Sequence, residues 1–540
     1  MSEKLGVATY RVESGVAVLT IDSPPVNALG LAVRTALSEG VARALADDSV
    51  AALVLICAGR TFFAGADVTE IGKPILPPLL GDVITQFENS AKLILAAMHG
   101  TALGGGLELA LAAHYRVAVP SATVGLPEVA LGLLPGAGGT QRVPRLIGVA
   151  AAVEMIGLGQ HVNARQALST GLIDAIVEEG ELETQAIAFA RDLLAKQAPL
   201  RRLRDLSTDL TLEQATPVFV GFRAAHPELF AGVKAAEGVL QAIEAAITLP
   251  FDMGIERERE ISRFLIASPE SAAQRHLFFA ERAAAKFPGH EREKAPAIGT
   301  VGVVGDWIHA PLLEQKGLIG DGAAQAIILA MSNDGSQPLE TLSRDATIVL
   351  VNRVEKLDAL AMKMPDPGAV VGLSYTRGVA EIVVGGATRP AAALAAGVIA
   401  RKLGWAAIFV GAVPGLVLGR LAAGLQAAIS ALLADSVAPA DIRATGKAFG
   451  FAGGLLPDAA EGGVVDAGLE QRLVWPVLAE ASVLVDEGAA KRSSDIDFAM
   501  VRAGLWPLWR GGPAFMAERV GHGQLTEWMA ATGHPAQLAS

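Results

Sequence analysis

The stretch Ala102-Leu-Gly-Gly-Gly-Leu-Glu108 places three consecutive glycines between a short apolar run and a helical pattern over Leu107–Ala113. Without a Cβ atom, glycines let a ligand or a second backbone segment come close. The helix that follows points its free N–H groups and the positive end of its dipole at whatever lies there. The stretch therefore predicts a strand-to-helix turn that forms a polar backbone site.

The residues around this turn alternate between short β-rich runs and helical patterns. Strands are predicted at Val16–Ile21, Ala51–Ile56, Leu93–Met98 and Tyr115–Val119, with a further helix at Leu31–Ala46. Strands that alternate with helices are typical of βα crossovers, so residues 1–190 are predicted to form an α/β domain.

Beyond residue 190 the pattern changes. Residues 191–295 are predicted to be a helical linker, with the charged runs Arg201-Arg202 and Glu256–Glu260 on solvated faces. Strand patterns return in residues 296–411, at Thr300–Val304, Thr347–Val351 and Val379–Val384. Residues 412–540 are predicted to be helical, which gives an α/β protein with a large helical C-terminal part.

The uncharged stretch Leu403–Gly419 is the nearest approach to a membrane span. Its 17 residues are at the short limit for crossing a bilayer, and they include several glycines and a proline. A buried strand at Ala406–Gly411, a turn at Val413-Pro414 and an amphipathic helix explain it better. We therefore predict no membrane span.

Composition narrows the class of protein. The chain has 540 residues, 51% of them apolar, which is ample for large cores. A net charge of −12 argues against non-specific binding to nucleic acid or to an anionic membrane. The single cysteine, Cys57, excludes a disulfide framework, and the N-terminus lacks the apolar run of a signal peptide. These features lead us to expect a cytoplasmic protein.

A second small-residue turn, Phe62–Asp67, follows another buried strand. If the two turns converge, each can donate one N–H group to a polarised carbonyl oxygen. Glu108 begins the helix after the first turn, and Glu128 follows 20 residues later. Two carboxylates beside a polarised carbonyl can act as acid and base. On spacing alone, a plain tight turn and a glutamate that only complements the helix dipole are the more common interpretations of these features.

Three motifs in order resemble the crotonase (enoyl-CoA hydratase/isomerase) superfamily: Phe63–Asp67, Gly104–Glu108 and Leu126–Arg142. The resemblance runs from about Val7 to Val177. It implies that Ala66 and Gly105 donate oxyanion-hole N–H groups to a thioester oxygen. It also implies that Glu108 and Glu128 hold and activate water. The positions that it implies for contact with coenzyme A are Ala64, Gly65, Asp67, Gly104 and Gly136.

Four further stretches resemble parts of a fused enzyme. Phe251–Glu258 and Gln274–Arg282 are similar to the linker of bifunctional β-oxidation enzymes, in which a crotonase domain precedes a 3-hydroxyacyl-CoA dehydrogenase. Arg472–Ala481 and Arg510–Pro513 resemble the end of the dehydrogenase part. The resemblance implies a truncated Rossmann-like domain at 296–411 and a dehydrogenase-like helical region at 412–540.

The stretch that corresponds to the NAD-binding turn is poorly suited to NAD. A dinucleotide fold needs a glycine-rich turn under the pyrophosphate. Here Gly305 is followed by Trp307 and Ala310 at the next two glycine positions. Only 73 positions separate Val301 from Ser374, fewer than a complete dinucleotide-binding fold requires.

The positions that match the catalytic residues of the dehydrogenase are also altered. By resemblance, Ser374 replaces a histidine, Val354 a serine and Gly419 an asparagine, while Glu381, the partner of the missing histidine, remains. Without an imidazole there is no general base near neutral pH for a hydroxyl proton. We therefore predict an inactive dehydrogenase half and doubt that NAD binds.

The sequence thus predicts an enoyl-CoA hydratase that converts a 2-enoyl-CoA to a 3-hydroxyacyl-CoA, with no required cofactor and no metal. A Δ3–Δ2 enoyl-CoA isomerase and an intact NAD-dependent bifunctional enzyme remain as alternatives. The C-terminal half is alternatively a scaffold that docks another β-oxidation enzyme, such as a thiolase.

Overall fold

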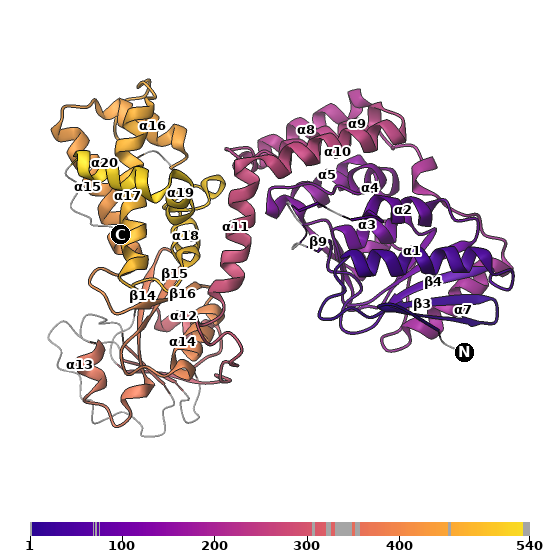
Figure 1. The fold of residues 1–540 in the computed structure, drawn as a ribbon, viewed down its shortest axis with the longest axis horizontal. Helices are drawn as coiled ribbons and strands as arrows, with labels where there is room; N and C mark the ends of the chain where they lie inside the picture. Colours follow the sequence, from indigo (N-terminus) through magenta and orange to yellow (C-terminus); the bar gives the residue numbers. More distant parts are fainter. Residues whose placement is uncertain are drawn as a thin grey trace. The chain divides into compact units, whose positions relative to one another are not determined.

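The structure is a computed structural model that describes residues 3–67, 70, 73–74, 76–304, 308–319, 326–329, 348–351, 357–451 and 455–532. The chain divides into two compact units, residues 1–272 and residues 273–540 (Figure 1).

The first unit is built on a seven-stranded sheet in the order β1-β2-β3-β4-β5-β7-β10. A smaller sheet has the order β6-β8-β9. Strands β3, β4, β5 and β7 run parallel to one another, whereas β2 is antiparallel to β3. Strands β4 and β5 are buried along their whole length. The strands are β1 (Glu3–Leu5), β2 (Ala8–Glu13), β3 (Val16–Ile21), β4 (Ala52–Cys57), β5 (Leu93–Met98), β6 (Thr101–Leu103), β7 (Tyr115–Ala118), β8 (Thr123–Gly125), β9 (His161–Asn163) and β10 (Ala175–Ile176).

Helices cover these sheets, and a helical layer follows them in sequence. They are α1 (Leu31–Ala46), α2 (Leu80–Glu88), α3 (Gly105–Ala112), the 3-10 helix η2 (Glu128–Leu131), α4 (Gly139–Ile147), α5 (Val149–Gly157), α6 (Ala164–Ser169), α7 (Leu182–Ala195), α8 (Leu212–Ala225), α9 (Ala235–Thr248) and α10 (Phe251–Ala267). Helix α9 contacts α4, α5 and α10, and α10 also contacts α4 (Figure 1). Helices α9 and α10 therefore both contact α4, the helix that follows η2 in the chain.

The second unit contains a six-stranded sheet in the order β11-β12-β13-β14-β15-β16. The first four strands are parallel, β15 is antiparallel to β14, and β16 is parallel to β15. The strands are β11 (Val301–Val304), β12 (Ala326–Leu329), β13 (Ile348–Val351), β14 (Val370–Thr376), β15 (Val379–Val384) and β16 (Ala406–Gly411). The helices that accompany them are α12 (Ala310–Gln315), α13 (Leu357–Ala361) and α14 (Pro390–Lys402).

The rest of the second unit is helical. Its helices are α15 (Leu416–Ala434), α16 (Pro439–Phe449), α17 (Ala467–Asp486), α18 (Ser493–Arg502), α19 (Pro513–Val520) and α20 (His522–Thr532), and α11 (Pro269–Ala284) crosses from one unit to the other. Among the described helices, only α15 is long and apolar enough to cross a membrane. Its apolar face packs against α17, and residues such as Leu418, Leu421 and Leu432 are buried there, as in the core helix of a folded domain.

The fold class predicted from the sequence is confirmed. Four predicted strands have the observed bounds: β3, β5, β15 and β16. Helix α3 begins at Gly105, two residues before the predicted start, because the glycines themselves form its first turn. The predicted boundaries at residues 190, 295 and 411 remain predictions.

One surface prediction is wrong. Glu258 was expected on a solvated face and is completely buried, because α10 packs against α4 along the side that carries it. Its neighbours Glu256 and Glu260 are exposed as expected.

Candidate active site

The triple-glycine turn has a backbone shape that only glycine adopts easily. Gly104 has φ +55° and ψ −129°, and its N–H donates to the Gly125 carbonyl at 2.9 Å. A Cβ at Gly104 would lie 2.9 Å from Oε1 of Glu128. Both the dihedral angles and the neighbouring carboxylate therefore require glycine at this position.

The two predicted turns converge. Leu103 N–H donates to the Phe63 carbonyl at 3.0 Å, and Gly65, with φ +115°, accepts from Leu29 N–H at 3.0 Å. A Cβ on Gly105 would lie 3.6 Å from the Ala66 nitrogen, so the two amides are close neighbours. These hydrogen bonds fix one turn against the other.

The amides of Ala66 and Gly105 are available to a ligand. Gly105 is the first residue of α3, where an N–H has no partner within the helix. Within the described residues, neither amide donates to another group of the protein. The pair therefore has the character of an oxyanion hole: two fixed N–H donors beside a helix N-terminus.

Glu108 lies in the first turn of α3 and is 3% exposed. Its Oε1 accepts hydrogen bonds from the Ala137 and Gly139 amides, each at 2.8 Å. Burial raises the pKa of Glu108, while the two amides and the Arg142 guanidinium oppose that rise. The pKa of Glu108 therefore stays above its usual value, but the two amides and Arg142 offset part of the effect of burial.

Glu128 begins η2 and has a different environment. Its Oε2 is enclosed and has no hydrogen-bond partner among the described residues. Burial raises the pKa of Glu128 well above its usual range, and the charges of Glu108 and Glu258 raise it further. Two carboxyl groups whose surroundings separate their pKa values are suited to serve as base and acid.

Glu258 on α10 is a third carboxyl group of this site, and sequence reasoning missed it. Its oxygens accept from Gly138 N–H at 2.7 Å, Thr140 N–H at 3.1 Å and the Thr140 hydroxyl at 2.5 Å. Burial raises its pKa to about 8, with a further contribution from Glu108. The alternating Glu-Arg-Glu-Arg-Glu pattern is typical of a solvated helix, and no local signal in it marks the buried member.

A buried ion pair supports the same segment. Arg142 donates to Glu88 through Nε at 3.0 Å and Nη2 at 2.8 Å, and both side chains are almost completely buried. The Nη1 atom of Arg142 also donates to the Ala137 carbonyl at 3.2 Å. Ala137 is therefore fixed at both ends of its backbone: its N–H group donates to Glu108, and its carbonyl accepts from Arg142.

The positions expected to contact coenzyme A lie around these turns. Ala64 is exposed and Gly65 is buried, and Asp67 is close to Gly30, where a Cβ would lie 3.1 Å from Oδ2 of Asp67. Gly136 is exposed, and a Cβ there would lie 3.0 Å from the Ser262 hydroxyl on α10. Of these positions, Gly65 and Gly104 are neighbours, since a Cβ on Gly104 would lie 3.9 Å from Cα of Gly65. The contact of the five positions with coenzyme A remains a prediction.

In the second unit, Ser374 on β14 lies directly opposite Glu381 on β15 in the strand register. Oε1 of Glu381 accepts from Val417 N–H at 2.9 Å and Leu418 N–H at 3.2 Å, at the start of α15. Burial raises the pKa of Glu381 to about 7. Gly419 is exposed on α15, and Val354, Gly305 and Trp307 lie outside the described residues.

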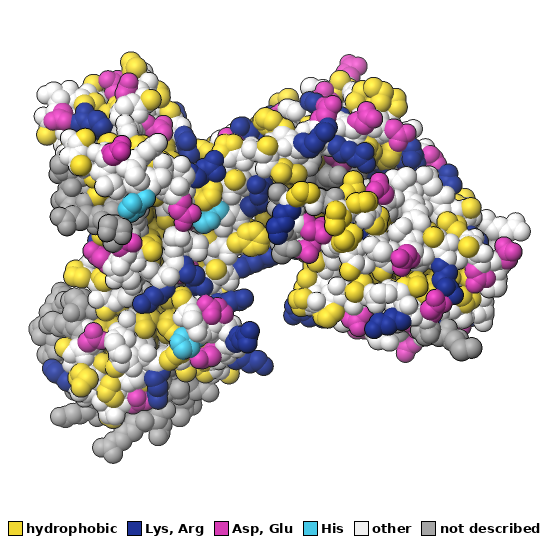
Figure 2. Space-filling view, in the orientation of Figure 1, with side chains coloured by type: hydrophobic (Ala, Val, Ile, Leu, Met, Phe, Trp, Pro, Cys, Tyr) yellow, Lys and Arg dark blue, Asp and Glu magenta, His cyan; other side chains and the backbone are white. Residues whose placement is uncertain are grey.

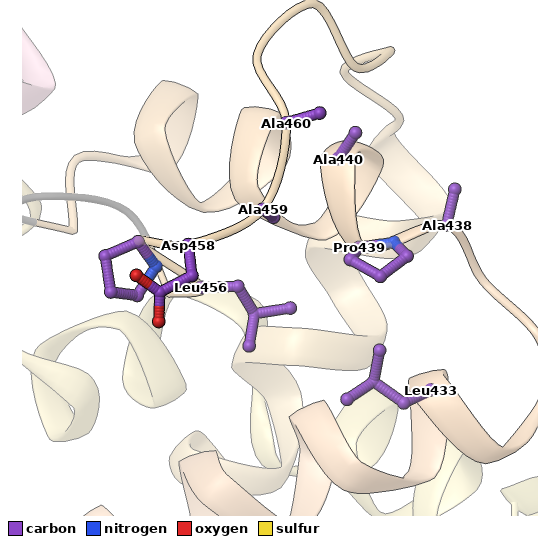
Figure 3. Close-up of a pocket in the computed structure, with 9 residues that line it drawn as sticks. Leu433, Ala438, Pro439, Ala440, Leu456, Asp458, Ala459 and Ala460 are labelled. Carbon is purple, nitrogen blue, oxygen red and sulfur yellow. The ribbon is translucent and has the colours of Figure 1, made fainter.

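A separate cavity of about 510 Å³ opens among the C-terminal helices (Figure 3). It is lined by Leu433, Ala438, Pro439, Ala440, Leu456, Pro457, Asp458, Ala459 and Ala460. Asp458 is the only titratable side chain in this lining, so the cavity lacks the paired groups that acid–base chemistry needs.

Charges are mixed on the visible surface of both units. Figure 2 shows Lys and Arg side chains interspersed with Asp and Glu side chains rather than gathered over one broad area. Among the described residues there is no group of three His, Cys, Asp or Glu side chains that could hold a metal ion.

Comparison with known proteins identifies the first unit. Residues 11–240 match the family described as enoyl-CoA hydratase/isomerase. The chain is 43% identical over 280 residues to a peroxisomal bifunctional enzyme of Danio rerio, an alignment that covers 51% of this chain and 38% of that protein. It is 35% identical over 357 residues to the peroxisomal bifunctional enzyme of Homo sapiens, covering 64% and 48% of the two chains.

The chain is also similar to a further curated protein and to a solved structure. A glyoxysomal fatty acid beta-oxidation multifunctional protein of Cucumis sativus is 35% identical, with 58% of this chain and 44% of that protein covered. The solved structure of DspI from Pseudomonas aeruginosa is 29% identical, covering 48% of this chain and 95% of that one, with a TM-score of 0.34. The chain spans about half the length, or less, of the curated relatives named here.

These names correct the expected location. The expectation of a cytoplasmic protein is wrong, because the similar proteins are named peroxisomal or glyoxysomal. A lone cysteine and an N-terminus without an apolar run do not specify a compartment, since some compartments are addressed by short receptor-read signals. The resemblance to the crotonase superfamily is confirmed: residues 11–240 form an enoyl-CoA hydratase/isomerase domain, and the chain is homologous to proteins named peroxisomal bifunctional enzymes.

Proposed function

We propose that the first unit is an enoyl-CoA hydratase that adds water to a 2-enoyl-CoA and yields a 3-hydroxyacyl-CoA. The observation that carries the proposal is the unequal environment of two neighbouring glutamates. Glu108 accepts two backbone amides that favour its charged form, whereas Glu128 has an enclosed oxygen without a partner and a raised pKa. Near neutral pH this arrangement supports one base and one acid.

The proposed reaction uses each group once. Glu108 takes a proton from water while the water oxygen bonds to Cβ of the enoyl group. The electron pair of the double bond moves toward the thioester, whose oxygen is held by the amides of Ala66 and Gly105. Glu128 then donates its proton to Cα, and exchange with solvent restores both glutamates.

The same site also suits a Δ3–Δ2 enoyl-CoA isomerase, which moves a proton along an equivalent oxyanion intermediate. That reaction needs one carboxylate beside the oxyanion hole, and Glu128 has this position next to Gly104. The hydrogen-bonded Glu108 is the feature that favours hydration, since a second positioned carboxylate is what water activation requires.

We further propose that the C-terminal half has no dehydrogenase activity. The described strands of its sheet run in sequential order, whereas dinucleotides bind where the strand order of such a sheet reverses. Glu381 is occupied by two amides at the start of α15 and therefore serves as a helix cap. The sequential strand order and the hydrogen bonds of Glu381 support the proposal that this half does not use NAD, and we assign no step to that cofactor.

The relatives are named for fatty acid β-oxidation, and we extend that role to this chain as part of the proposal. The docking of a further β-oxidation enzyme such as a thiolase remains a prediction from the sequence.

A panel of 2-enoyl-CoA and 3-enoyl-CoA substrates, assayed with and without NAD, tests these proposals. We expect hydration of 2-enoyl-CoA with no NADH formed from the product. Conversion of 3-enoyl-CoA without hydration of 2-enoyl-CoA would identify an isomerase instead. NADH formation from a 3-hydroxyacyl-CoA would overturn the proposal for the C-terminal half.

A further inference from the structure

Four consecutive backbone amides, from Ala137 to Thr140, are divided between two carboxyl groups. Glu108 on α3 accepts from the first and third, and Glu258 on α10 accepts from the second and fourth. All four donor–acceptor distances lie between 2.7 and 3.1 Å. The segment at the start of α4 is therefore held between two carboxyl groups that bind alternate amides.

We propose that Glu258 is a positioning residue for hydration, which holds the Ala137–Thr140 segment so that its other two amides stay directed at the base Glu108. This inference rests on the proposed function of the first unit. It assigns a role in the site to α10, a helix that lies beyond the residues 11–240 matched by the family.

The contacts of Glu258 are those of a built support. The side chain is fully buried, and a buried carboxyl group is costly unless hydrogen bonds replace its water. Here three donors replace it: two amides and the Thr140 hydroxyl. Successive amides of this segment donate alternately to the two carboxyl groups, so neither group alone can accept hydrogen bonds from all four amides. Loss of either carboxyl group therefore leaves the backbone of the segment free to rotate.

The backbone at this point needs an external support. Gly138 has φ +101°, and a Cβ there would overlap the Arg142 guanidinium at 1.8 Å. A glycine in this conformation has wide backbone freedom of its own. The hydrogen bond from Gly138 N–H to Glu258 therefore restrains the most adaptable residue of the segment.

Charge links Glu258 to the reacting pair. The titratable groups that face it are Glu108 from α3, Glu128 from η2 and Arg142 from α4. When ionised, Glu258 raises the pKa of Glu128, so its removal lowers that pKa. Loosened Ala137 and Gly139 amides, in turn, raise the pKa of Glu108 because they no longer favour its charged form.

The decisive variant is Glu258→Gln in the full chain, with Glu256→Gln as its matched control. Both changes replace one glutamate on the same helix with its amide analogue, and Glu256 is exposed. In E258Q we expect kcat for 2-enoyl-CoA to fall by about 10- to 100-fold, with KM within about twofold of its original value, because misplacement of a reacting group by fractions of an ångström acts on the reaction step. E256Q is expected to keep the original kcat.

The pH profile separates positioning from a general loss of structure. Hydration requires ionised Glu108 and protonated Glu128, so the rate rises and then falls with pH. In E258Q the acid limb of the pH–rate profile, set by Glu108, is expected to move to higher pH. The alkaline limb, set by Glu128, is expected to move to lower pH, so the pH range of activity becomes narrower. A variant that is merely less folded lowers the whole curve without moving either limb.

Amide hydrogen exchange provides a readout that does not depend on activity. In E258Q we expect exchange at Ala137 and Gly139, which Glu258 does not bind, to become at least about tenfold faster, because their segment opens locally. In E256Q it is expected to stay unchanged. Unchanged exchange at these two amides in E258Q would overturn the proposal, whatever the activity.

Thr140→Val gives a milder test if E258Q fails to fold. It removes one of the three donors to Glu258 and keeps the β-branched shape, so a several-fold fall in kcat is expected. Full activity in T140V, together with an unshifted pH profile, would overturn the positioning role. If the original protein hydrates 2-enoyl-CoA and E258Q equals it, only this inference fails. If the original protein does not hydrate the substrate, the proposed function fails and the exchange result still decides the positioning role.

Discussion

Replacing Glu88 with glutamine leaves the Arg142 guanidinium buried without its carboxylate partner. The two side chains are 2% and 3% exposed and joined by two hydrogen bonds of 2.8 and 3.0 Å. Removal of one member of such a pair costs about 3–5 kcal/mol, because the other charge stays buried and uncompensated. For a unit of 272 residues this corresponds to a fall of roughly 6–20 °C in Tm.

The distribution of tryptophan gives an assay that separates the two units. All six tryptophans lie within residues 273–540 and none in residues 1–272. Tryptophan fluorescence therefore follows the second unit, whereas far-ultraviolet circular dichroism follows both. In E88Q we expect an early circular dichroism transition to move to lower temperature while the fluorescence transition keeps its midpoint.

The control is Glu260→Gln, which breaks the exposed pair of Arg257 and Glu260 on α10. The two atoms of that pair are 3.0 Å apart and the side chains are 47% and 56% exposed, so the change is expected to cost no more than about 0.5 kcal/mol. If E88Q lowers the free energy of unfolding of the first unit as little as E260Q does, the buried pair of Glu88 and Arg142 does not stabilise that unit.

Three further outcomes are expected. Gly104→Ala places a Cβ 2.9 Å from Oε1 of Glu128 and should lower the hydration rate by about 10- to 100-fold, whereas Gly6→Ala, with a similar φ of +57° and open space around it, should leave the rate unchanged. The titration of Glu381 alone should cost the second unit roughly 3 kcal/mol of stability between pH 4.5 and pH 7. The reason is that the folded pKa of Glu381 is raised to about 7, so its contribution is complete below the unfolded pKa and is lost as pH rises through the folded one. Urea unfolding followed by tryptophan fluorescence measures this, and E381Q should remove the share of the slope due to Glu381. The part that persists includes Asp497, whose pKa is raised to about 6, and Asp495, whose pKa is also raised. Incubation with a 3-hydroxyacyl-CoA and NAD should form no NADH, and spectrophotometric detection of NADH at a rate comparable to hydration would contradict that.

The sequence predicts the elements whose signals are local. The runs of β-branched and aliphatic residues at β3, β5 and β15 identify buried strands, since no other short element suits them. The three glycines at Gly104–Gly106 similarly require a close approach, and the structure places the Phe63 carbonyl 2.4 Å from a Cβ built on Gly106.

What depends on distant partners could not be predicted. Glu258 meets its donors 118 and 120 positions away, and nothing in its own helix distinguishes it from the exposed Glu256. The sequential order of the strands in the second unit is also invisible in a hydrophobic pattern, which indicates where strands occur and not how they are paired. Glu381 was recognised by resemblance as a catalytic partner, yet its role as a helix cap follows only from the position of α15.

The central claim is that two glutamates with unequal environments perform hydration. Its most direct test is the initial rate of 2-enoyl-CoA hydration by the original protein, Glu108→Gln and Glu128→Gln, each at the pH optimum of the original protein. Loss of a positioned acid or base lowers such rates by about 10²- to 10⁴-fold, and we predict a fall in that range for each variant. Retention of most of the hydration rate in both variants would contradict the account.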